Sequence, residues 1–432
     1  MADNAVIVGA GVIGLATAYR LAQDGLEVTV VDGADGESGA SVHNAGWIVP
    51  VLSAPVPAPG MVGQALRWMT RRDSPLYIRP TPCPEHVRFM ASMLRYCRPG
   101  PFQHGVAALA SLSERAVPLF DRYAADGVRF EYHRTGQLMA FQTLEAMRRY
   151  QAATAPMERI GHPAVPLSGD ELRDLEPALG RQVRAGLRCP QERHLDPVDL
   201  VRGLRDRCRE LGVRFLQNSP VTDIRLRGRA VASVLAGGEE LGGDLFVLTA
   251  GAHTGRLARL AGCPLPVQPG KGHGFDDTGG TVALRHSVYL GEAKVAVSPL
   301  SDRLRFAGTM EFGSFDTAVD RRRLAGIVRS AQEFLPGFSP GSAPRGWTGL
   351  RPMTPDGLPV IGPLPDKDNV LVASGHCMLG VTLAPVTADV VSAYVAGGRQ
   401  LSEIAGAVRP FAPRRFLSGR SATTAGSPAA SR

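Results

Sequence analysis

The chain contains few lysines, although it is basic. Only Lys271, Lys294 and Lys367 are lysines, whereas lysine and arginine together number 48 and the formal net charge is +8. A basic protein can bind nucleic acid or an anionic membrane surface, but here the arginines are scattered along the chain. We therefore expect no nucleic-acid partner, and we keep a loose contact with a membrane surface as an alternative.

The cysteines are too widely spaced to form a common metal or redox motif. No pair has the C-x-x-C spacing of a zinc site or a dithiol redox site. They therefore predict structural thiols, and we expect no metal centre. The six residues are Cys83, Cys97, Cys189, Cys208, Cys263 and Cys377.

Signals for membranes and export are also missing. No apolar run reaches the ~20 residues that cross a bilayer. The opening MADNAVIVG has neither the basic segment nor the apolar core of a signal peptide. We expect a cytoplasmic protein, with peripheral contact at the inner membrane face as the alternative. The 432 residues, 44% hydrophobic and 20% charged, suffice for two or three domains with a sizeable core.

The strongest motif present is a glycine-rich turn near the start. Residues 5–14 read AVIVGAGVIG, in which Gly9, Gly11 and Gly14 have the G-x-G-x-x-G spacing. An apolar run precedes the turn and a small-residue helical pattern follows it, as in a βαβ dinucleotide unit. There the glycines allow a tight turn, close approach of a pyrophosphate and close packing of helix on strand. The helix N-terminus adds free N–H groups and a positive dipole.

An acidic residue follows at the expected distance. A second apolar run, residues 28–31, ends at Asp32. In this motif an acid about 20 residues after the turn binds the ribose hydroxyls. The acid disfavours a phosphorylated ribose, so the sequence predicts FAD or NAD rather than NADP. A glycine-rich packing turn without a ligand is the structural alternative.

Helix and strand patterns continue through the chain. Residues 33–60 form a long loop of small residues and proline, which is typical of a functional loop. Asp196 and Pro197 predict the start of an amphipathic helix, and a hairpin is expected around residues 301–302. Further helices are expected at 104–126 with a break at Pro118, 143–159 and 318–335, and strands at 128–133, 137–141, 213–216, 221–226, 230–235, 244–248 and 369–373.

Several stretches together resemble one family. In chain order they are GAGVIG at 9–14, GASVHNAG at 39–46, APGMVGQALRWMTRRDSPLYIRP at 58–80, LEPAL at 175–179, DLFVLTAGAHT at 244–254, PVQPGKGHGF at 266–275, RLRFAGTMEF at 303–312, GLRPMTPDGLPVIGP at 349–363 and GHCMLGVTLAP at 375–385. The set resembles the FAD-dependent amine oxidoreductases that include D-amino-acid dehydrogenase, glycine oxidase and sarcosine oxidase. The pattern is most similar to the small-subunit type of D-amino-acid dehydrogenase.

The resemblance implies an α/β Rossmann-like FAD-binding domain and a second α+β domain built on a large antiparallel sheet. We expect the FAD-binding domain to consist of residues 1–60, 191–262 and 346–412. Residues 61–190 and 263–345 mainly form the expected substrate domain, and we expect residues 413–432 to be a disordered tail.

The resemblance also implies which residues hold FAD. Glycines in the 375–380 stretch allow close approach to the flavin ring, and N–H groups there can stabilise negative charge on the reduced ring. The expected cofactor-binding residues are Gly9, Gly11, Gly14, Asp32, Ser41, His43, Asn44, Ala45, Gly46, Val221, Ala250, Gly251, Gly375, His376, Met378, Leu379, Gly380 and Thr382.

Three departures from the dehydrogenase pattern leave the substrate open. His43 stands where Gly or Ala is usual, His273 where Tyr is common and Cys377 where Gly is common. The stretch around His43 also resembles the loop of dimethylglycine dehydrogenase, in which a histidine is bonded covalently to the flavin. Packing of His43 near the ring without a bond is the alternative.

The chemistry implied by the resemblance is oxidation of an amino acid, with D-amino acids as the leading substrates. Hydride passes from Cα to the flavin, and the imine then hydrolyses to an oxo acid and ammonia. Arg351 aligns with the arginine that holds the substrate carboxylate, a role suited to a planar double donor. An ion pair with an acid such as Asp356 is the structural alternative. Tyr289 and His273 are further pocket candidates, or else plain sheet residues.

Other substrates and acceptors stay open at this point. A cyclic or N-methyl amino acid, such as a proline-like compound, sarcosine or glycine, is the chemical alternative. A flavin-binding subunit of a heteromeric dehydrogenase is a second alternative. We expect a quinone or another carrier as the electron acceptor, with oxygen as the alternative.

Overall fold

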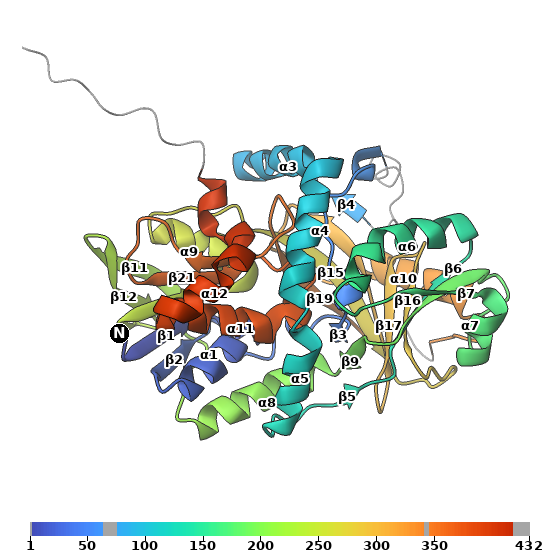
Figure 1. Ribbon diagram of the computed structural model, residues 1–432, viewed down its shortest axis with the longest axis horizontal. Coiled ribbons are helices and arrows are strands. Elements are labelled where there is room, and N and C mark those ends of the chain that lie inside the picture. The colour runs from blue at the N-terminus through green and yellow to red at the C-terminus, as the bar shows by residue number, and fades with distance from the viewer. Residues whose placement is uncertain (1, 64–75, 341–344, 418–432) are drawn as a thin grey trace, which may run out of the picture.

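The computed structural model describes residues 2–63, 76–340 and 345–417. Figure 1 shows two lobes, with the parallel strands and their helices on the left and a large sheet on the right. Helices α4 (Pro99–Ser113) and α5 (Ala116–Ala125) run between the lobes at the front of this view.

The first sheet is the dinucleotide-type sheet that the sequence predicts. Its strand order is β10-β2-β1-β14-β21-β20, and all neighbours are parallel except β20 and β21. The strands are β1 (Asn4–Val8), β2 (Glu27–Val31), β10 (Arg214–Leu216), β14 (Leu245–Leu248), β20 (Val360–Pro363) and β21 (Val370–Ser374).

Both faces of this sheet are covered, as a parallel sheet requires. Ala5 and Ile7 of β1 pack against the face that holds α1 (Val12–Gln23), α8 (Pro197–Glu210) and α11 (Gly380–Ala396). Val6 and Val8 point to the opposite face, which holds α9 (Thr254–Leu260) and a three-stranded sheet. That sheet consists of β11 (Val221–Arg227), β12 (Ala230–Ala236) and β13 (Glu239–Gly242), of which β13 was not expected.

The second sheet is large and mostly antiparallel. Its order is β19-β15-β18-β17-β16-β6-β8-β7, with β4 paired to β18; only the β16–β6 and β18–β4 pairs are parallel. The strands are β4 (Leu76–Ile78), β6 (Gln137–Phe141), β7 (Val165–Ser168), β8 (Ala185–Cys189), β15 (Gln268–Asp277), β16 (Ser287–Leu290), β17 (Val295–Pro299), β18 (Leu304–Phe312) and β19 (Gly346–Met353).

The two faces of the large sheet have different neighbours. Helices α7 (Gly169–Leu175) and α10 (Arg321–Phe334) pack on one face with an apolar core. The other face contacts the loop that follows β2, since Arg305 donates to Val42 O at 3.0 Å and Ser298 to Ala45 O at 2.6 Å. The site described below lies on this second face, which we call the loop-side face.

Local signals set several boundaries as expected. Asp196 caps α8 by accepting a hydrogen bond from Val198 N at 2.8 Å. Strands β17 and β18 form the predicted hairpin. The remaining elements are α3 (Pro84–Tyr96), α6 (Leu144–Glu158), α12 (Gly398–Val408), β3 (Trp47–Ile48), β5 (Tyr132–His133), β9 (Arg193–Leu195) and the 3₁₀ turns Pro50–Leu52, Gly251–His253, Arg409–Phe411 and Pro413–Phe416.

Three expectations differ from the structure. The break expected at Pro118 falls earlier, between α4 and α5, because proline is tolerated in the first turn of a helix. Residues 346–353, assigned to the FAD-binding domain, form β19 and pair with β15 in the large sheet. Ordered structure continues past residue 412 to residue 417; the expected disordered tail beyond it, 418–432, lies outside the described residues.

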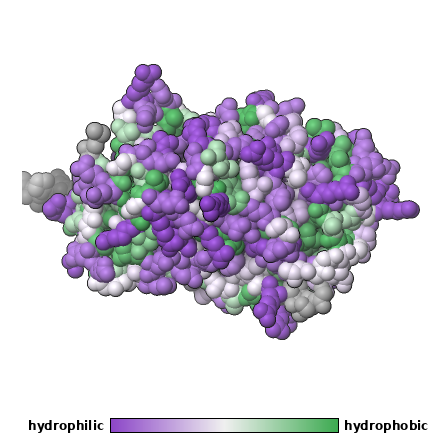
Figure 2. Space-filling view, turned by 90° about the horizontal axis from the view of Figure 1, so that it is seen from below, coloured by the Kyte–Doolittle hydropathy of each residue, from purple (hydrophilic) through white to green (hydrophobic). Residues whose placement is uncertain are grey.

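Among the described residues, no helix is long and apolar enough to cross a bilayer. Figure 2 shows one face of the molecule on which hydrophilic residues predominate and apolar residues form separate small patches.

Candidate functional site

The glycine turn has the close contacts that its spacing predicts. Gly9 has φ +117°, and a Cβ atom there would lie 2.7 Å from Thr249 O. A Cβ atom on Gly14 would overlap the carbonyl oxygen of Gly9. Gly11 is the N-cap of α1, and a Cβ atom there would lie 2.9 Å from Ser41 Oγ. None of the three glycines can therefore carry a side chain without moving its neighbours, and the N-terminus of α1 begins directly at the turn.

Two other predicted residues lie at the turn. Asp32 follows β2, and its carboxylate accepts hydrogen bonds from Ala10 N at 2.6 Å and Ala34 N at 2.8 Å. Ser41 Oγ accepts one from Val12 N at 2.9 Å. The structure thus brings the glycines, the acid and the start of the 39–46 loop together.

The 39–46 loop is held rigidly. Asn44 donates to Ala40 O at 2.9 Å and Ser41 O at 2.8 Å, and it accepts from Gly46 N at 2.7 Å. Gly46 has φ +70°, and a Cβ atom there would overlap Leu195 O. Because Ala45 O also accepts the Ser298 hydroxyl, the loop has one position over the large sheet.

His43 points from this loop to the large sheet. Its ring stacks on Trp347, with centroids 5.6 Å apart and planes 14° apart. Burial, and then the charge of Arg305, lowers the pKa of His43, so the imidazole is neutral at pH 7. Its Nδ1 atom is buried and has no hydrogen-bond partner.

Small residues separate two aromatic residues on the loop-side face. One register row crosses five strands as Trp347, Gly274, Ala307, Ala296 and Tyr289. The middle of this row therefore has no side chain larger than a methyl group. The chain segment after β2 lies over this row, with His43 against Trp347 at one end and Trp47 against Tyr289 at the other.

Arg351 lies on the same face. A Cβ atom at Gly272 would lie 2.5 Å from Cζ of Arg351, so the guanidinium rests on the glycine backbone. Its Nη1 donates to Thr309 O at 2.9 Å and approaches Met310 Sδ at 3.7 Å. No carboxylate of the described residues forms an ion pair with it, and desolvation lowers the pKa of Arg351 to about 10. The side chain is thus a half-buried cation with no acidic partner among the described residues.

The acid expected as the alternative partner of Arg351 is paired with another arginine. Asp356 forms its ion pair with Arg415, at 2.6 Å between Oδ2 and Nε. Arg415 belongs to the last described turn of the chain, and no local pattern relates it to Asp356.

Tyr289 lies at the far end of the small-residue row. Its hydroxyl is 3.1 Å from that of Tyr150, and its ring meets Trp47 edge to face at 6.0 Å. Lys294 contacts the Tyr150 hydroxyl and lies 5.9 Å from the Tyr289 ring centroid. Burial raises the pKa of Tyr289 well above its ordinary value. Three strands lie between Tyr289 on β16 and Arg351 on β19, so these two candidates are not in contact.

His273 lies on the other face. Side chains alternate along β15, so Gly272 and Gly274 face the loop while Lys271 and His273 face α10. Lys271 there approaches Glu311 at 3.8 Å. Burial, and then the charge of Lys271, lowers the pKa of His273 to about 4. The structure does not bring His273 and the guanidinium of Arg351 together on one face.

The 375–382 stretch connects the parallel sheet to the loop. Gly375 and Cys377 have positive φ angles of +74° and +52°. Cys377 N donates to Pro352 O at 3.0 Å, next to Arg351. Thr382 accepts from Val49 N and donates to Trp47 O, both at 3.1 Å.

The other predicted residues of this stretch differ in exposure. His376 is buried, contacts Thr387 Oγ1 at 2.9 Å and has its pKa lowered to about 3 by burial. Leu379 is buried, Gly380 begins α11, and Met378 is 58% exposed. Met378 is therefore free to contact a ligand that the buried residues cannot reach.

Three further predicted residues lie at the ends of strands β14 and β11. Ala250 and Gly251 follow β14, and Ser374 donates to Gly251 O at 3.1 Å. Val221 begins β11 and packs in the core below the parallel sheet.

The sequence did not identify Arg305 as a site residue. Arg305 donates a hydrogen bond to Val42 O and so holds the loop, and it forms an ion pair with Asp276 at 2.8 Å. It lies in the 303–312 stretch, but no motif gives it a role.

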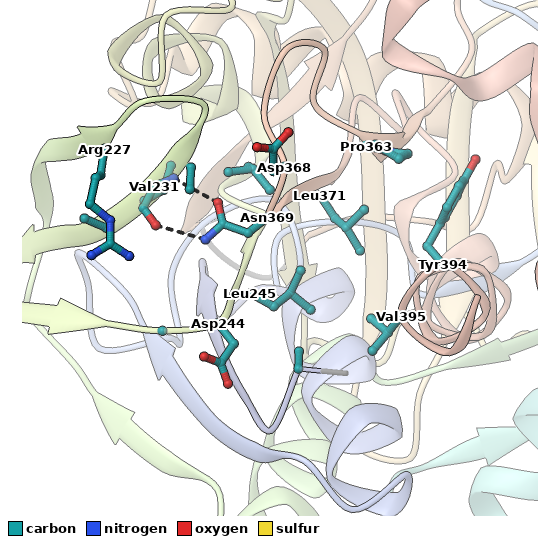
Figure 3. A pocket seen from close by; sticks show the side chains of 15 residues that line it. Arg227, Val231, Asp244, Leu245, Pro363, Asp368, Asn369, Leu371, Tyr394 and Val395 are labelled. Atoms are coloured by element: carbon teal, nitrogen blue, oxygen red, sulfur yellow. Dashed lines mark hydrogen bonds between the residues drawn. The ribbon is translucent and has the colours of Figure 1, made fainter. Parts of the chain in front are cut away.

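A surface hollow of about 630 Å³ lies away from these residues. Figure 3 shows it at the amino ends of β14 and β21, with Asn369 bonded to Val231 of β12. The glycine turn follows the carboxyl end of β1, so it lies at the other end of the parallel strands. None of the predicted site residues lines the hollow.

Comparisons with known proteins agree with this geometry. A family model described as FAD dependent oxidoreductase matches residues 4–394. A D-amino acid dehydrogenase of Xanthobacter autotrophicus is 33% identical over 402 residues, covering 91% of this chain and 95% of that protein. The solved structure of glycine oxidase from Bacillus cereus aligns with TM-score 0.70 and 18% identity over 92% of this chain and 96% of that one. L-proline dehydrogenase from P. horikoshii aligns with TM-score 0.71 and 18% identity, over 96% and 98%.

Proposed function

The chain belongs to the FAD dependent oxidoreductase family, and from that premise we propose that it oxidises amino acids, with D-amino acids as the leading substrates. The observation that carries the proposal is Arg351, a half-buried guanidinium on the loop-side face that has no acidic partner within the described part of the chain. An α-carboxylate is the group that its planar pair of donors fits. The 33% identity to a D-amino acid dehydrogenase supports the choice of substrate class.

The residues of the site fit FAD. Gly9, Gly11 and Gly14 leave backbone open for the pyrophosphate, and Asp32 stands at the end of β2 for the ribose. The 39–46 loop and the 375–382 stretch converge through Thr382 for the ring. When bound, FAD supplies the hydride acceptor for the substrate Cα–H bond.

The protein orients the substrate. Arg351 pins the carboxylate, so that the Cα–H bond has one direction left to point. Gly272 of β15 leaves room for the guanidinium beside the strand, which sets where the carboxylate is held. Tyr289 lies four strand spacings from Arg351, too far to contact a small amino acid held there, and no acid–base triad is needed for this step.

The test is an absorbance titration of the purified flavoprotein without oxygen. D- and L-amino acids, glycine, sarcosine and proline are added in turn. We expect the flavin bands to bleach with D-amino acids at the lowest concentrations. Bleaching by proline or sarcosine alone would select the cyclic or N-methyl alternative. Bleaching by none, with FAD bound, would indicate a flavin-binding subunit of a heteromeric complex.

For the electron acceptor, we propose a quinone or another carrier rather than oxygen. The support is the similarity to a dehydrogenase. Peroxide formation in air is compared with turnover of an artificial quinone. We expect slow peroxide formation and fast quinone reduction, and equal rates would contradict the proposal.

For a peripheral membrane contact, the support comes from α3. Val87 and Leu94 are 58% and 53% exposed on one side of this helix, seven residues apart, which is two helical turns. Arg88 and Arg95 beside them are also exposed. Co-sedimentation with vesicles containing anionic lipid is the measurement, and the double variant Val87→Ser, Leu94→Ser should reduce it.

A further inference from the structure

A β-bulge in β18 lies next to Arg351. Opposite β15, Lys271 pairs with Glu311 but His273 pairs with Gly308, so β18 has one extra residue in this interval. The extra residue is Thr309, which has φ +59°. A β-branched residue in the left-handed region is uncommon and persists only where its surroundings hold it there.

The bulge decides which side chains share the face of Arg351. Side chains alternate along a strand, so one extra residue moves every later side chain to the opposite face. With the bulge, Met310 lies beside Arg351, while Glu311 lies on the α10 side near Lys271. In a regular strand the Glu311 carboxylate would lie on the loop-side face. The bulge therefore keeps an internal anion away from Arg351.

Thr309 also contacts both sides of the sheet. Its carbonyl oxygen accepts the hydrogen bond from Arg351 Nη1 at 2.9 Å. Its hydroxyl accepts from His273 N at 3.2 Å and lies 3.1 Å from His273 Nδ1. The hydroxyl contacts thus hold the residue whose carbonyl orients the guanidinium.

We propose that Thr309 is a positioning residue for Arg351: the bulge it forms keeps the guanidinium oriented and unneutralised, ready for a carboxylate. This inference rests on the proposed function, in which Arg351 binds the substrate carboxylate. It gives His273 a role through the Thr309 hydroxyl rather than by contact with substrate.

The test uses propionate, which is alanine without its amino group, as the probe. Its Kd for the purified flavoprotein is measured from the change in flavin absorbance. Thr309→Ser keeps the hydroxyl, whereas Thr309→Val and Thr309→Gly remove it; glycine also tolerates the positive φ, so it serves if the valine variant does not fold. Thr348→Val is the matched control, because Thr348 is a buried threonine of β19, on the other side of β15 from β18, and its hydroxyl bonds Thr317 O instead.

We expect the valine and glycine variants to bind propionate about 2- to 10-fold more weakly, the span of the one neutral hydrogen bond that they lose. The KM for D-alanine should rise in parallel, with kcat changed less. The serine variant and the Thr348→Val control should stay near wild type, and all should retain FAD.

The outcomes separate the two proposals. If wild type binds propionate and Thr309→Val and Thr309→Gly bind it equally well, the role of Thr309 is overturned and the carboxylate site stands. A similar loss in Thr348→Val also overturns it, because any buried hydroxyl would then matter. If wild type does not bind propionate, the carboxylate site itself fails, and the role of Thr309 fails with it.

Discussion

The guanidinium of Arg351 rests directly on the backbone of Gly272. A Cβ atom at Gly272 would lie 2.5 Å from Cζ of Arg351, well inside van der Waals contact. The two residues lie on neighbouring strands, β19 and β15. The position of the guanidinium that we propose binds the substrate carboxylate therefore depends on the absence of a side chain at Gly272 of β15.

Gly272→Ala should displace Arg351 while leaving FAD bound. A misplacement of about 1 Å near the reacting centre can lower kcat/KM on the order of 100-fold. Kinetics with D-alanine and the flavin content of the purified protein are the measurements. Gly242→Ala is the control, because the nearest atom to its new methyl group is Ala232 O at 3.7 Å. Equal activities in both variants would show that the contact is unimportant.

Arg351→Lys should keep FAD and lose carboxylate substrates. Breaking a bidentate, desolvated pair costs roughly 2–5 kcal/mol, or about 30- to several-thousand-fold in kcat/KM. Ethylamine, which is alanine without the carboxylate, should be affected far less. Both substrates are measured on wild type and variant. Equal losses on the two would make Arg351 a structural residue.

Gly14→Ala should prevent FAD binding. The new methyl group would overlap Gly9 O and lie 2.7 Å from Thr249 Oγ1, so α1 must move away from the turn, at a cost of about 1–3 kcal/mol in stability. Flavin absorbance and the melting temperature are the measurements. Gly100→Ala in α4 is the control, since no atom lies within 4 Å of its new methyl group. Wild-type flavin content in Gly14→Ala would contradict the assignment.

His43 should not retain the flavin after acid precipitation. Its ring is stacked on Trp347, a contact that favours packing of His43 near the flavin ring without a bond. We therefore expect the yellow colour in the supernatant. Colour that stays in the pellet, and moves to the supernatant in His43→Ala, would instead establish a covalent bond.

Stability should fall as the pH falls below 6.5, partly through His194. Burial, and then the neighbouring His133, lowers the pKa of His194 to about 4. Between pH 6.5 and 4 the unfolded chain binds a proton that the folded chain does not, so the free energy of unfolding decreases with decreasing pH. Melting temperatures across this range should decline less steeply in His194→Gln. His104→Gln, at an exposed position, should leave the slope unchanged.

Local sequence determined the nucleotide half of the site. The spacing of Gly9, Gly11 and Gly14, with Asp32 after the next strand, depends on contacts within one βαβ unit, and the structure has those contacts. The cap of α8 at Asp196 is local in the same way. Such features can be predicted because the interacting residues are close along the chain. The family motifs extended the prediction to Arg351.

Tertiary structure alone decided which side chains share the substrate side of the large sheet. His273 and Gly272 are adjacent in sequence yet face opposite ways, and the extra residue Thr309 in β18 sends Glu311 away from Arg351. Asp356 is neutralised by Arg415 from the end of the described chain. These outcomes depend on strand register and on partners far apart in sequence, and neither leaves a periodic or local signal in the residues themselves.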